Sequence, residues 1–289
     1  MNSHQVESLR FLVKNKNKLP LKNMRVIAVS SGKGGVGKTN LVVNLALALT
    51  EYNYRVIILD GDLGLANVDV VFGITPHYNI NHLISGEKRI EEILYPVCKG
   101  VQIFPGASGV AELANLDRIQ LKNVLSNMGR LERMADILLI DTGAGLGHTV
   151  IDFICASDEV IVVMTPEPSS MTDAYGLLKT IKQQAIKIRT NVVVNMAQNE
   201  QDARQAYERL EKATTRFLEL ELNLLGWIYD DPLISRSVRT QKPLGLSAPQ
   251  SNAYRCIKWI AANMVGDYQK KPVVNKGIRG FIFSLLKIK

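Results

Sequence analysis

Cysteine is scarce in this sequence, and the few thiols are not grouped. Cys98, Cys155 and Cys256 are the three cysteines, and no two of them form a CxxC pair. This spacing argues against a metal or iron–sulfur site, and with it an iron–sulfur carrier, and against a disulfide framework. We expect inert, partly buried thiols in a reducing compartment.

Long apolar runs are also missing. No signal peptide opens the chain, and no hydrophobic stretch reaches the length of a transmembrane helix. The 289 residues are nevertheless 46% hydrophobic, which is enough for a sizeable core in one large α/β domain or two smaller ones. We therefore expect a cytoplasmic protein.

A net positive charge is missing from the body of the chain. Residues 1–23 hold five Lys or Arg and one acid, and residues 265–289 hold six and one, which leaves residues 24–264 at −1 of the total +8. A DNA-binding body is usually basic itself. Charge placed on the two ends predicts end-specific partners and no specific nucleic acid.

The strongest motif lies near the start of the body. Residues 32–39 fit the phosphate-loop pattern G-x-x-x-x-G-K-[ST], between a predicted strand over 26–29 and apolar residues at helical spacing over 41–49. Glycines let several N–H groups point at one phosphate, and the helix N-terminus adds positive potential. Lys38 would neutralise the outer phosphates and Thr39 would bind Mg²⁺. The predicted nucleotide-binding residues are Gly32, Lys33, Gly34, Gly35, Val36, Gly37, Lys38, Thr39 and Asn40.

Two further predicted strands end in carboxylates. Residues 55–59 lead into Asp60 and Asp62, and residues 137–140 lead into Asp141. Open α/β sheets bind ligands at the carboxyl ends of their strands, so we expect these acids near the phosphate loop. Asp141 fits the Walker B position, whose carboxylate holds Mg²⁺ directly or through water. The alternative for Asp60 and Asp62 is that they cap a helix or solvate a loop.

Lys33 adds a more specific signal. The stretch Lys33-Gly34-Gly35-x-Gly37-Lys38-Thr39 resembles the deviant Walker A loop of the MinD/ParA ATPases, whose early lysine reaches across a dimer interface to the partner's nucleotide. The resemblance implies an ATP-dependent sandwich dimer in which Lys33 acts in trans and Lys38 acts in cis. The alternative is an exposed loop lysine.

The same resemblance extends to the switch regions. Residues 60–69 are similar to switch I, which implies that Asp62 places the attacking water and that Asp60 supports the Mg²⁺ shell. Gly143 and Gly145 belong to a segment similar to switch II, with Gly143 where the family often has proline.

Two later positions resemble the family's adenine contacts. They are Asn195, which follows a predicted strand over 191–194, and Asp231, which follows one over 224–228. An Asn at a strand end is also common for turn reasons. Tyr229 stands where the family usually has proline.

The N-terminal residues are similar to the D-Q-A-x-x-L-R segment of FlhG proteins, MinD-like ATPases that control flagellar number and placement. Gln5, Leu9 and Arg10 match, whereas His4 and Val6 depart from the pattern. In that family the segment binds and stimulates the signal-recognition-type GTPase FlhF, so the resemblance implies an FlhF-type partner. The alternative is a disordered basic leader.

The C-terminal residues form a basic amphipathic stretch. Wound as a helix, residues 276–289 gather one apolar face from Ile278, Phe281, Ile282, Leu285 and Leu286. At about 1.5 Å per residue this helix is too short to span a bilayer, and its composition is typical of a helix in the membrane interface. MinD and FlhG proteins carry a similar membrane-targeting helix. The alternative is that it packs on the domain, and both hold if ATP-driven dimerisation releases a docked helix.

We therefore predict a single α/β P-loop NTPase domain over 24–264, with a mainly parallel, doubly wound sheet and helices on both faces. A basic segment over 1–23 precedes it, and a linker over 265–275 and a membrane-targeting helix over 276–289 follow.

The resemblance implies an FlhG-type ATPase that uses ATP and Mg²⁺ and lies peripherally on the inner face of the cell membrane. It also implies a homodimer, with flagellar switch or C-ring components as further partners. The rivals are a division-site MinD, a ParA-type DNA-segregation ATPase, and an interaction module that acts on a GTPase and uses ATP only as a conformational ligand.

Overall fold

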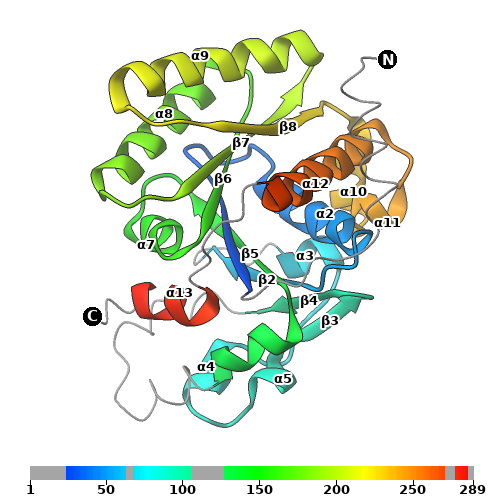
Figure 1. Cartoon of the computed structure of the whole chain (residues 1–289). Coiled ribbons are helices and arrows are strands. Elements are labelled where there is room, and N and C mark those ends of the chain that lie inside the picture. The colour runs from blue at the N-terminus through cyan, green and yellow to red at the C-terminus, as the bar shows by residue number, and fades with distance from the viewer. Residues whose placement is uncertain (1–23, 63–67, 106–126, 271–276, 286–289) are drawn as a thin grey trace.

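A computed structural model describes residues 24–62, 68–105, 127–270 and 277–285, and one eight-stranded sheet runs through these residues (Figure 1). The spatial order is β3-β4-β2-β5-β1-β6-β7-β8, in which β3 pairs antiparallel with β4 and every other recorded pairing is parallel. The strands are β1 (Arg25–Ser31), β2 (Val56–Gly61), β3 (Tyr95–Cys98), β4 (Val101–Phe104), β5 (Ile137–Ala144), β6 (Glu159–Met164), β7 (Arg189–Ala197) and β8 (Asn223–Tyr229). The predicted single α/β domain with a mainly parallel sheet is confirmed.

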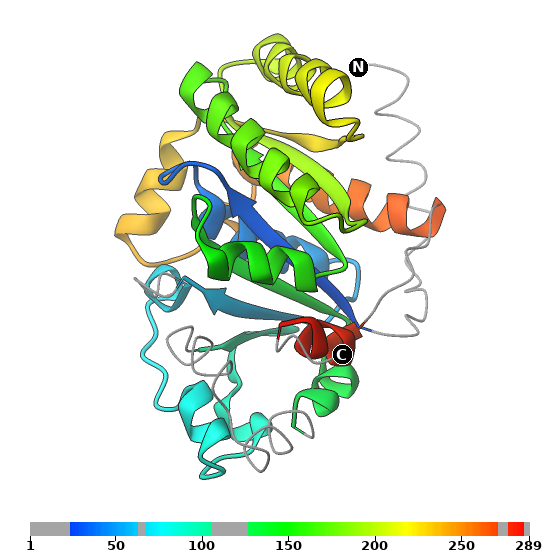
Figure 2. The same ribbon diagram turned by 90° about the vertical axis from the view of Figure 1, so that its left-hand side faces the viewer.

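Helices cover both faces of the sheet (Figures 1 and 2). The longer ones are α2 (Lys38–Thr50), α7 (His148–Ala156), α8 (Pro168–Gln183), α9 (Glu200–Leu218), α10 (Pro232–Arg239), α12 (Asn252–Lys270) and α13 (Gly277–Leu285). The shorter ones are α3 (Val68–Phe72), α4 (Ile80–Ile84), α5 (Ile90–Ile93) and α11 (Leu244–Ser247). Among these helices, none is long and apolar enough to cross a bilayer.

The central strands are apolar on both sides, as a parallel sheet buried between helices requires. In β1, Ile27 and Val29 belong to the core under α2 and α12, whereas Val26 and Ala28 belong to the cores on the opposite face. That opposite face is covered by α7, α8 and α13, which Figure 2 shows in front of the sheet. A continuous apolar run in the sequence therefore becomes a strand with two buried faces.

The segment that follows the last strand differs from the prediction. Helix α12 continues to Lys270, so the predicted linker over 265–275 begins inside a helix. Val265 is buried and joins the core under α2, which explains why the helix continues past residue 264.

Candidate functional site

The phosphate loop connects β1 to α2, and its glycines are required by close neighbours. Gly35 and Gly37 have φ values of 77° and 88°, which is the left-handed region that favours glycine. A Cβ on Gly37 would overlap the Asn195 side chain, and a Cβ on Gly32 would overlap the backbone carbonyl of Asp173 in α8. The loop is therefore held between β7 and α8.

Lys38 is a buried cation that contacts a hydroxyl instead of a carboxylate. Its Nζ donates to Ser31 Oγ at 2.9 Å. Burial lowers the pKa of Lys38, and the nearby charges of Asp141 and Asp62 act in the opposite direction. A phosphate at this position would supply the missing counter-charge.

Thr39 and Asp141 form the core of a cation site. Thr39 Oγ1 donates to Asp141 Oδ2 at 2.6 Å, and Asp141 Oδ1 is buried with no hydrogen-bond partner in the described part of the chain. Burial raises the pKa of Asp141 to about 7, an effect that Thr39 opposes and the charges of Asp60 and Asp62 reinforce. A hydroxyl beside an unsatisfied carboxylate suits Mg²⁺, which prefers hard oxygen ligands.

The protein does not build a complete metal cage here. Within the described ranges, no three acidic, histidine or cysteine side chains converge as a metal site. Mg²⁺ is usually held by one or two carboxylates together with substrate phosphates and water. The residues thus fit Mg²⁺ that arrives with a nucleotide, and its chemistry would be neutralisation of the phosphate charge.

Asp60 anchors both ends of switch I. Its Oδ1 accepts from the Asp62 N–H and its Oδ2 accepts from the Val68 N–H, both at 3.2 Å. Asp60 and Asp141 are register partners on β2 and β5, so the two carboxylates lie side by side. The contacts of Asp60 are thus those of a loop anchor, and its part in the Mg²⁺ shell stays a prediction.

Asp62 lies against switch II. A Cβ built on Gly143 would be 3.6 Å from Asp62 Oδ1, which is ordinary van der Waals contact. Gly145 has a φ of 91°, and its N–H donates to the Ser31 carbonyl at 2.9 Å. The predicted water-placing carboxylate and both predicted switch II glycines therefore adjoin the end of β1.

Lys33 is turned toward its own subunit. Its Nζ lies 2.8 Å from Glu167 Oε2 and 3.0 Å from Ser169 Oγ, at the N-terminus of α8. The Lys33 hydrogen bond and charge lower the pKa of Glu167. The sequence motif singled out Lys33 but did not connect it to these partners, because they lie more than a hundred residues away on another strand's loop.

The two predicted adenine contacts have other partners in this structure. Asn195 is buried, and its Nδ2 donates to the Val36 carbonyl at 2.8 Å, while its Oδ1 has no partner among the described residues. Asp231 caps α10 by accepting from the Leu233 N–H at 2.9 Å and reaches the Ala253 N–H at 3.3 Å. Asn195 thus clamps the phosphate loop, and its free acceptor suits an amino group such as that of adenine.

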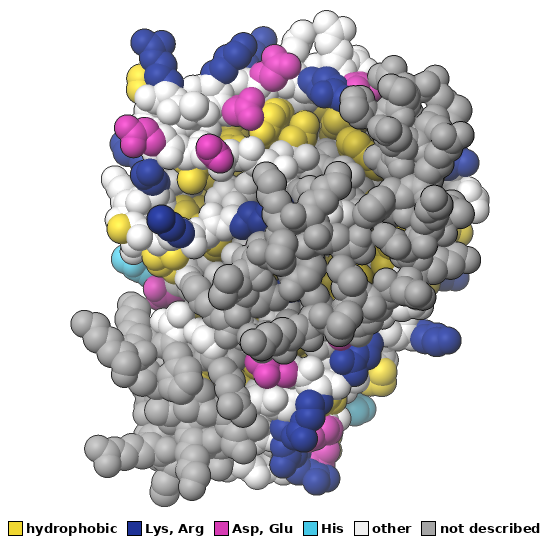
Figure 3. All heavy atoms as spheres, in the orientation of Figure 1, with side chains coloured by type: hydrophobic (Ala, Val, Ile, Leu, Met, Phe, Trp, Pro, Cys, Tyr) yellow, Lys and Arg dark blue, Asp and Glu magenta, His cyan; other side chains and the backbone are white. Residues whose placement is uncertain are grey.

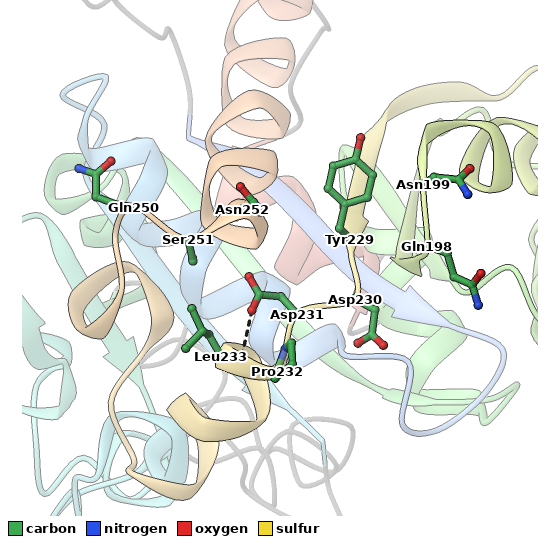
Figure 4. Close-up of a pocket in the computed structure, with 10 residues that line it drawn as sticks. All are labelled: Gln198, Asn199, Tyr229, Asp230, Asp231, Pro232, Leu233, Gln250, Ser251 and Asn252. Atoms are coloured by element: carbon green, nitrogen blue, oxygen red, sulfur yellow. Dashed lines mark hydrogen bonds between the residues drawn. The ribbon is translucent and has the colours of Figure 1, made fainter.

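A cavity of about 650 Å³ opens at the carboxyl ends of β7 and β8 (Figure 4). Asp231 lines it, whereas Asn195 is outside its lining. Tyr229 supplies an aromatic ring, and most other lining side chains carry amides, hydroxyls or carboxylates, as in Gln198, Asn199, Asp230, Gln250, Ser251 and Asn252. The cavity thus has a mixed polar and apolar lining and lies at the strand ends where open α/β sheets bind ligands.

Asn40 and the terminal residues complete the predicted set. Asn40 lies in the first turn of α2, where its carbonyl accepts from Asn44 Nδ2 at 2.8 Å. Ile278, Phe281 and Ile282 are buried, and Leu285 is partly buried against the same core. Gln5, Leu9, Arg10 and Leu286 lie outside the described residues.

Several known proteins are similar to this chain in sequence. A family model described as an AAA domain matches residues 24–194. The antiactivator FleN of Pseudomonas aeruginosa is 40% identical over 82% of this chain and 85% of its own length. The flagellum site-determining protein YlxH of Helicobacter pylori is 38% identical over 92% and 90%, respectively.

A solved structure extends the likeness to the fold. The septum site-determining protein MinD of Pyrococcus horikoshii, complexed with Mg-ADP, superposes with a TM-score of 0.65 at 26% identity, over 82% of this chain and 94% of that one. With the phosphate loop, the Thr39–Asp141 pair and the two flagellar relatives, the chain belongs to the MinD/ParA family of P-loop ATPases, in the branch that contains FleN and FlhG/YlxH.

Proposed function

We propose that this ATPase is a nucleotide-driven switch that controls the number and placement of flagella from the inner face of the cell membrane. The relatives FleN, an antiactivator, and YlxH, a flagellum site-determining protein, support the flagellar role. In the proposed cycle, ATP and Mg²⁺ drive a sandwich dimer, Asp62 places the attacking water, and Lys33 acts on the partner's nucleotide. Hydrolysis returns the protein to the monomer.

The observation that carries the membrane part is the docking of α13. Ile278, Phe281 and Ile282, three of the residues proposed to enter the lipid, are at most 2% exposed. The Phe281 ring stacks on Phe153 of α7, with 6.2 Å between ring centroids and 5° between planes. The apolar face of α13 is therefore covered by the domain in this state.

The size of this burial sets how the switch must work. Burying a large apolar side chain stabilises the docked state by about 1.5–3 kcal/mol each. Three such side chains make spontaneous release of α13 a rare event, so the helix needs a coupled process to leave. Dimerisation and lipid insertion can supply this coupled process. Lipid covers the same apolar face of α13, and the two α13 helices of a dimer bind the membrane with avidity.

Helix α7 is the proposed connection between the nucleotide and α13. It begins at His148, three residues after the switch II glycine Gly145, and it carries Phe153. We infer that a γ-phosphate sensed by switch II shifts α7 and loosens the Phe153–Phe281 contact. The Lys33–Glu167 contact has a matching role, since Lys33 must leave Glu167 to reach a second subunit.

The charge of α8 and α9 gives no support to a DNA-segregation role. In Figure 3, basic and acidic side chains are interspersed over α8 and α9, with no field of one sign there. Non-specific DNA binding relies on a continuous basic surface.

Co-sedimentation with vesicles that contain anionic lipid tests the proposal. The full chain should pellet with ATP and stay in solution with ADP, and deletion of residues 276–289 should abolish pelleting. A second variant keeps α13 in the chain but can hold it docked. It carries Phe153→Cys and Phe281→Cys, and its native Cys98, Cys155 and Cys256 are replaced. We expect a disulfide between the two new cysteines to hold α13 on α7, so this variant should pellet only when reduced. Pelleting that ignores nucleotide or the cross-link would overturn the switch.

The GTPase partner is proposed from residues 1–23 and has a separate test. A peptide of residues 1–20 should stimulate GTP hydrolysis by an FlhF-type GTPase, and a peptide with Gln5, Leu9 and Arg10 replaced by alanine should not. Equal rates with both peptides would remove this partner without affecting the membrane switch.

A further inference from the structure

The segment after β8 forms an exposed surface that the proposed ATPase cycle does not use. We call α10 and α11, with the residues that join them, the α10–α11 ledge; in Figure 2, α10 stands at the left edge of the molecule. Of the eight residues of α10, only Ser237 is buried. Leu233, Val238 and Leu246 are 37%, 36% and 45% exposed, so three of the large exposed hydrophobic side chains of the described residues belong to this ledge.

The charge of the ledge has one sign. Residues 232–266 contain five Lys or Arg and no Asp or Glu, although the body as a whole is slightly negative. Lys258 pairs with Glu51 of α2 at 3.4 Å, whereas the ledge residues Arg236, Arg239 and Lys242 have no carboxylate within 4.0 Å in the part of the chain that the structure describes. The ledge therefore combines unpaired cations with exposed apolar side chains.

The ledge is attached to the nucleotide site at both ends. At its start, Asp231 caps α10 and lines the cavity beside β8, and Leu233 lines the same cavity (Figure 4). At its end, the Gly245 N–H donates to Asn44 Oδ1 at 2.8 Å, and Asn44 lies on α2, which begins at Lys38. The ledge thus contacts the cavity at one end and α2 at the other.

We propose that the α10–α11 ledge binds an acidic amphipathic helix of a partner protein and that bound nucleotide changes its affinity. Acidic side chains of such a helix would pair with Arg236, Arg239 and Lys242, while its apolar face would cover Val238 and Leu246. The exposed apolar side chains favour a protein over nucleic acid, whose backbone would use only the cations. The position favours a protein over lipid, because Ile234 and Leu244 of the ledge pack into the core under α2, whereas α13 packs into the core on the other face of the sheet.

A designed peptide tests the chemistry of the ledge directly. The probe is a fluorescent helix of about 18 residues, with leucine along one face and glutamate on the others, and fluorescence anisotropy follows its binding to the full chain. The double variant Arg236→Glu/Arg239→Glu should weaken binding by at least about tenfold, and Val238→Ser by about threefold. Wild-type affinity should differ between ADP and a non-hydrolysable ATP analogue.

A matched variant distinguishes the ledge from any other basic helix. Arg209→Glu/Lys212→Glu makes the same charge change at the same spacing on the exposed side of α9, and it should leave the affinity within about twofold. ATP hydrolysis and thermal unfolding should be unchanged in both double variants, which separates this proposal from the proposed switch.

Three outcomes would overturn the proposal: no binding to the wild type, equal loss in the α9 variant, or no effect of the ledge variants on the peptide. Duplex DNA and anionic vesicles serve as competing probes. Loss of either of those interactions in the ledge variants, with peptide binding intact, would assign the ledge to nucleic acid or lipid and would also overturn the proposal.

Discussion

The parallel strands of the central sheet have buried charged side chains at both ends, but in opposite arrangements. We call the N-terminal ends of these strands the amino edge and their C-terminal ends the carboxyl edge. At the amino edge, Arg25 of β1 forms a 2.6 Å ion pair with Glu159 of β6, and both are at most 2% exposed. Asn191 Nδ2 donates to the same carboxylate at 3.3 Å, and Asn223 Nδ2 donates to Asn191 Oδ1 at 2.9 Å. Polar groups from four strands are thereby linked in one row.

At the carboxyl edge, three carboxylates gather beside one lysine, and no such row of polar groups links the strands among the recorded contacts of the described residues. Asp60, Asp62 and Asp141 lie together, and Lys38 donates to a hydroxyl. Burial raises the pKa of Asp141 to about 7, and one of its oxygens has no partner in the described residues. The amino edge is complete within the protein, whereas the carboxyl edge needs a cation and a phosphate to be satisfied. The polar contacts that stabilise the fold thus lie at the N-terminal ends of the strands, and the candidate functional site lies at their C-terminal ends.

The largest expected effect comes from breaking the amino edge. Glu159→Ala leaves Arg25 buried without its partner, which should destabilise the fold by about 3–5 kcal/mol. Urea unfolding measures the loss, and the affinity of the folded fraction for Mg·ADP should be unchanged. The double variant Arg25→Met/Glu159→Leu should recover most of the stability, because no buried charge is left unpaired. If the single variant unfolds like the wild type, the network contributes nothing.

The opposite result is expected at the carboxyl edge. Asp141→Asn keeps an acceptor for Thr39 but removes the buried charge, so Mg²⁺-dependent hydrolysis should fall by at least about a hundredfold while the ligand-free protein becomes more stable. The pKa of the Asp141 carboxyl is about 7 in the folded protein and 3.8 in the unfolded chain, so this group does not lower the free energy of unfolding below pH 3.8. The destabilisation grows as the pH rises toward 7, and above pH 7 it reaches about 4 kcal/mol of the free energy of unfolding.

Denaturant unfolding in EDTA without nucleotide checks this sign. The stability of the wild type should drop relative to Asp141→Asn between about pH 4 and about pH 7, and Mg·ADP should remove the difference by satisfying the wild-type carboxylate. Parallel pH profiles for the two proteins would show that Asp141 is not under electrostatic strain.

The smallest effect concerns the exposed contact that holds Lys33. Glu167→Gln should lower the ATP concentration needed for half-maximal dimerisation by up to about fivefold, because the side chains are 39% and 63% exposed and solvent weakens their attraction. Sedimentation analysis across an ATP titration measures it, and high salt should erase the difference. Glu200→Gln, which removes an exposed ion pair with Arg204 on α9, is the control and should not shift the curve. A higher ATP requirement for Glu167→Gln would mean that Glu167 assists the dimer.

Local patterns predicted most of the fold. The predicted strand over 137–140 and the helical spacing over 41–49 fall within β5 and α2, because continuous apolar runs and helical periodicity are properties of neighbouring residues. The prediction that residues 265–270 belong to a linker was wrong, because these residues continue α12, and Val265 packs into the core under α2. The sequence also indicated a nucleotide site, since the phosphate loop is a contiguous motif and the carboxylates follow their strands directly. The structure brings Thr39 to Asp141, and the roles of the site residues stay predictions.

The sequence by itself determined the chemistry of this protein: a phosphate loop, carboxylates at strand ends, and an amphipathic tail. Only the tertiary structure decided which side chains contact one another. It brought Lys33 to Glu167, Arg25 to Glu159, and Asn195 to the phosphate loop, and it covered Phe281 with Phe153. Each of these pairs joins residues more than a hundred positions apart, and strand order, which no local pattern specifies, sets which distant side chains meet.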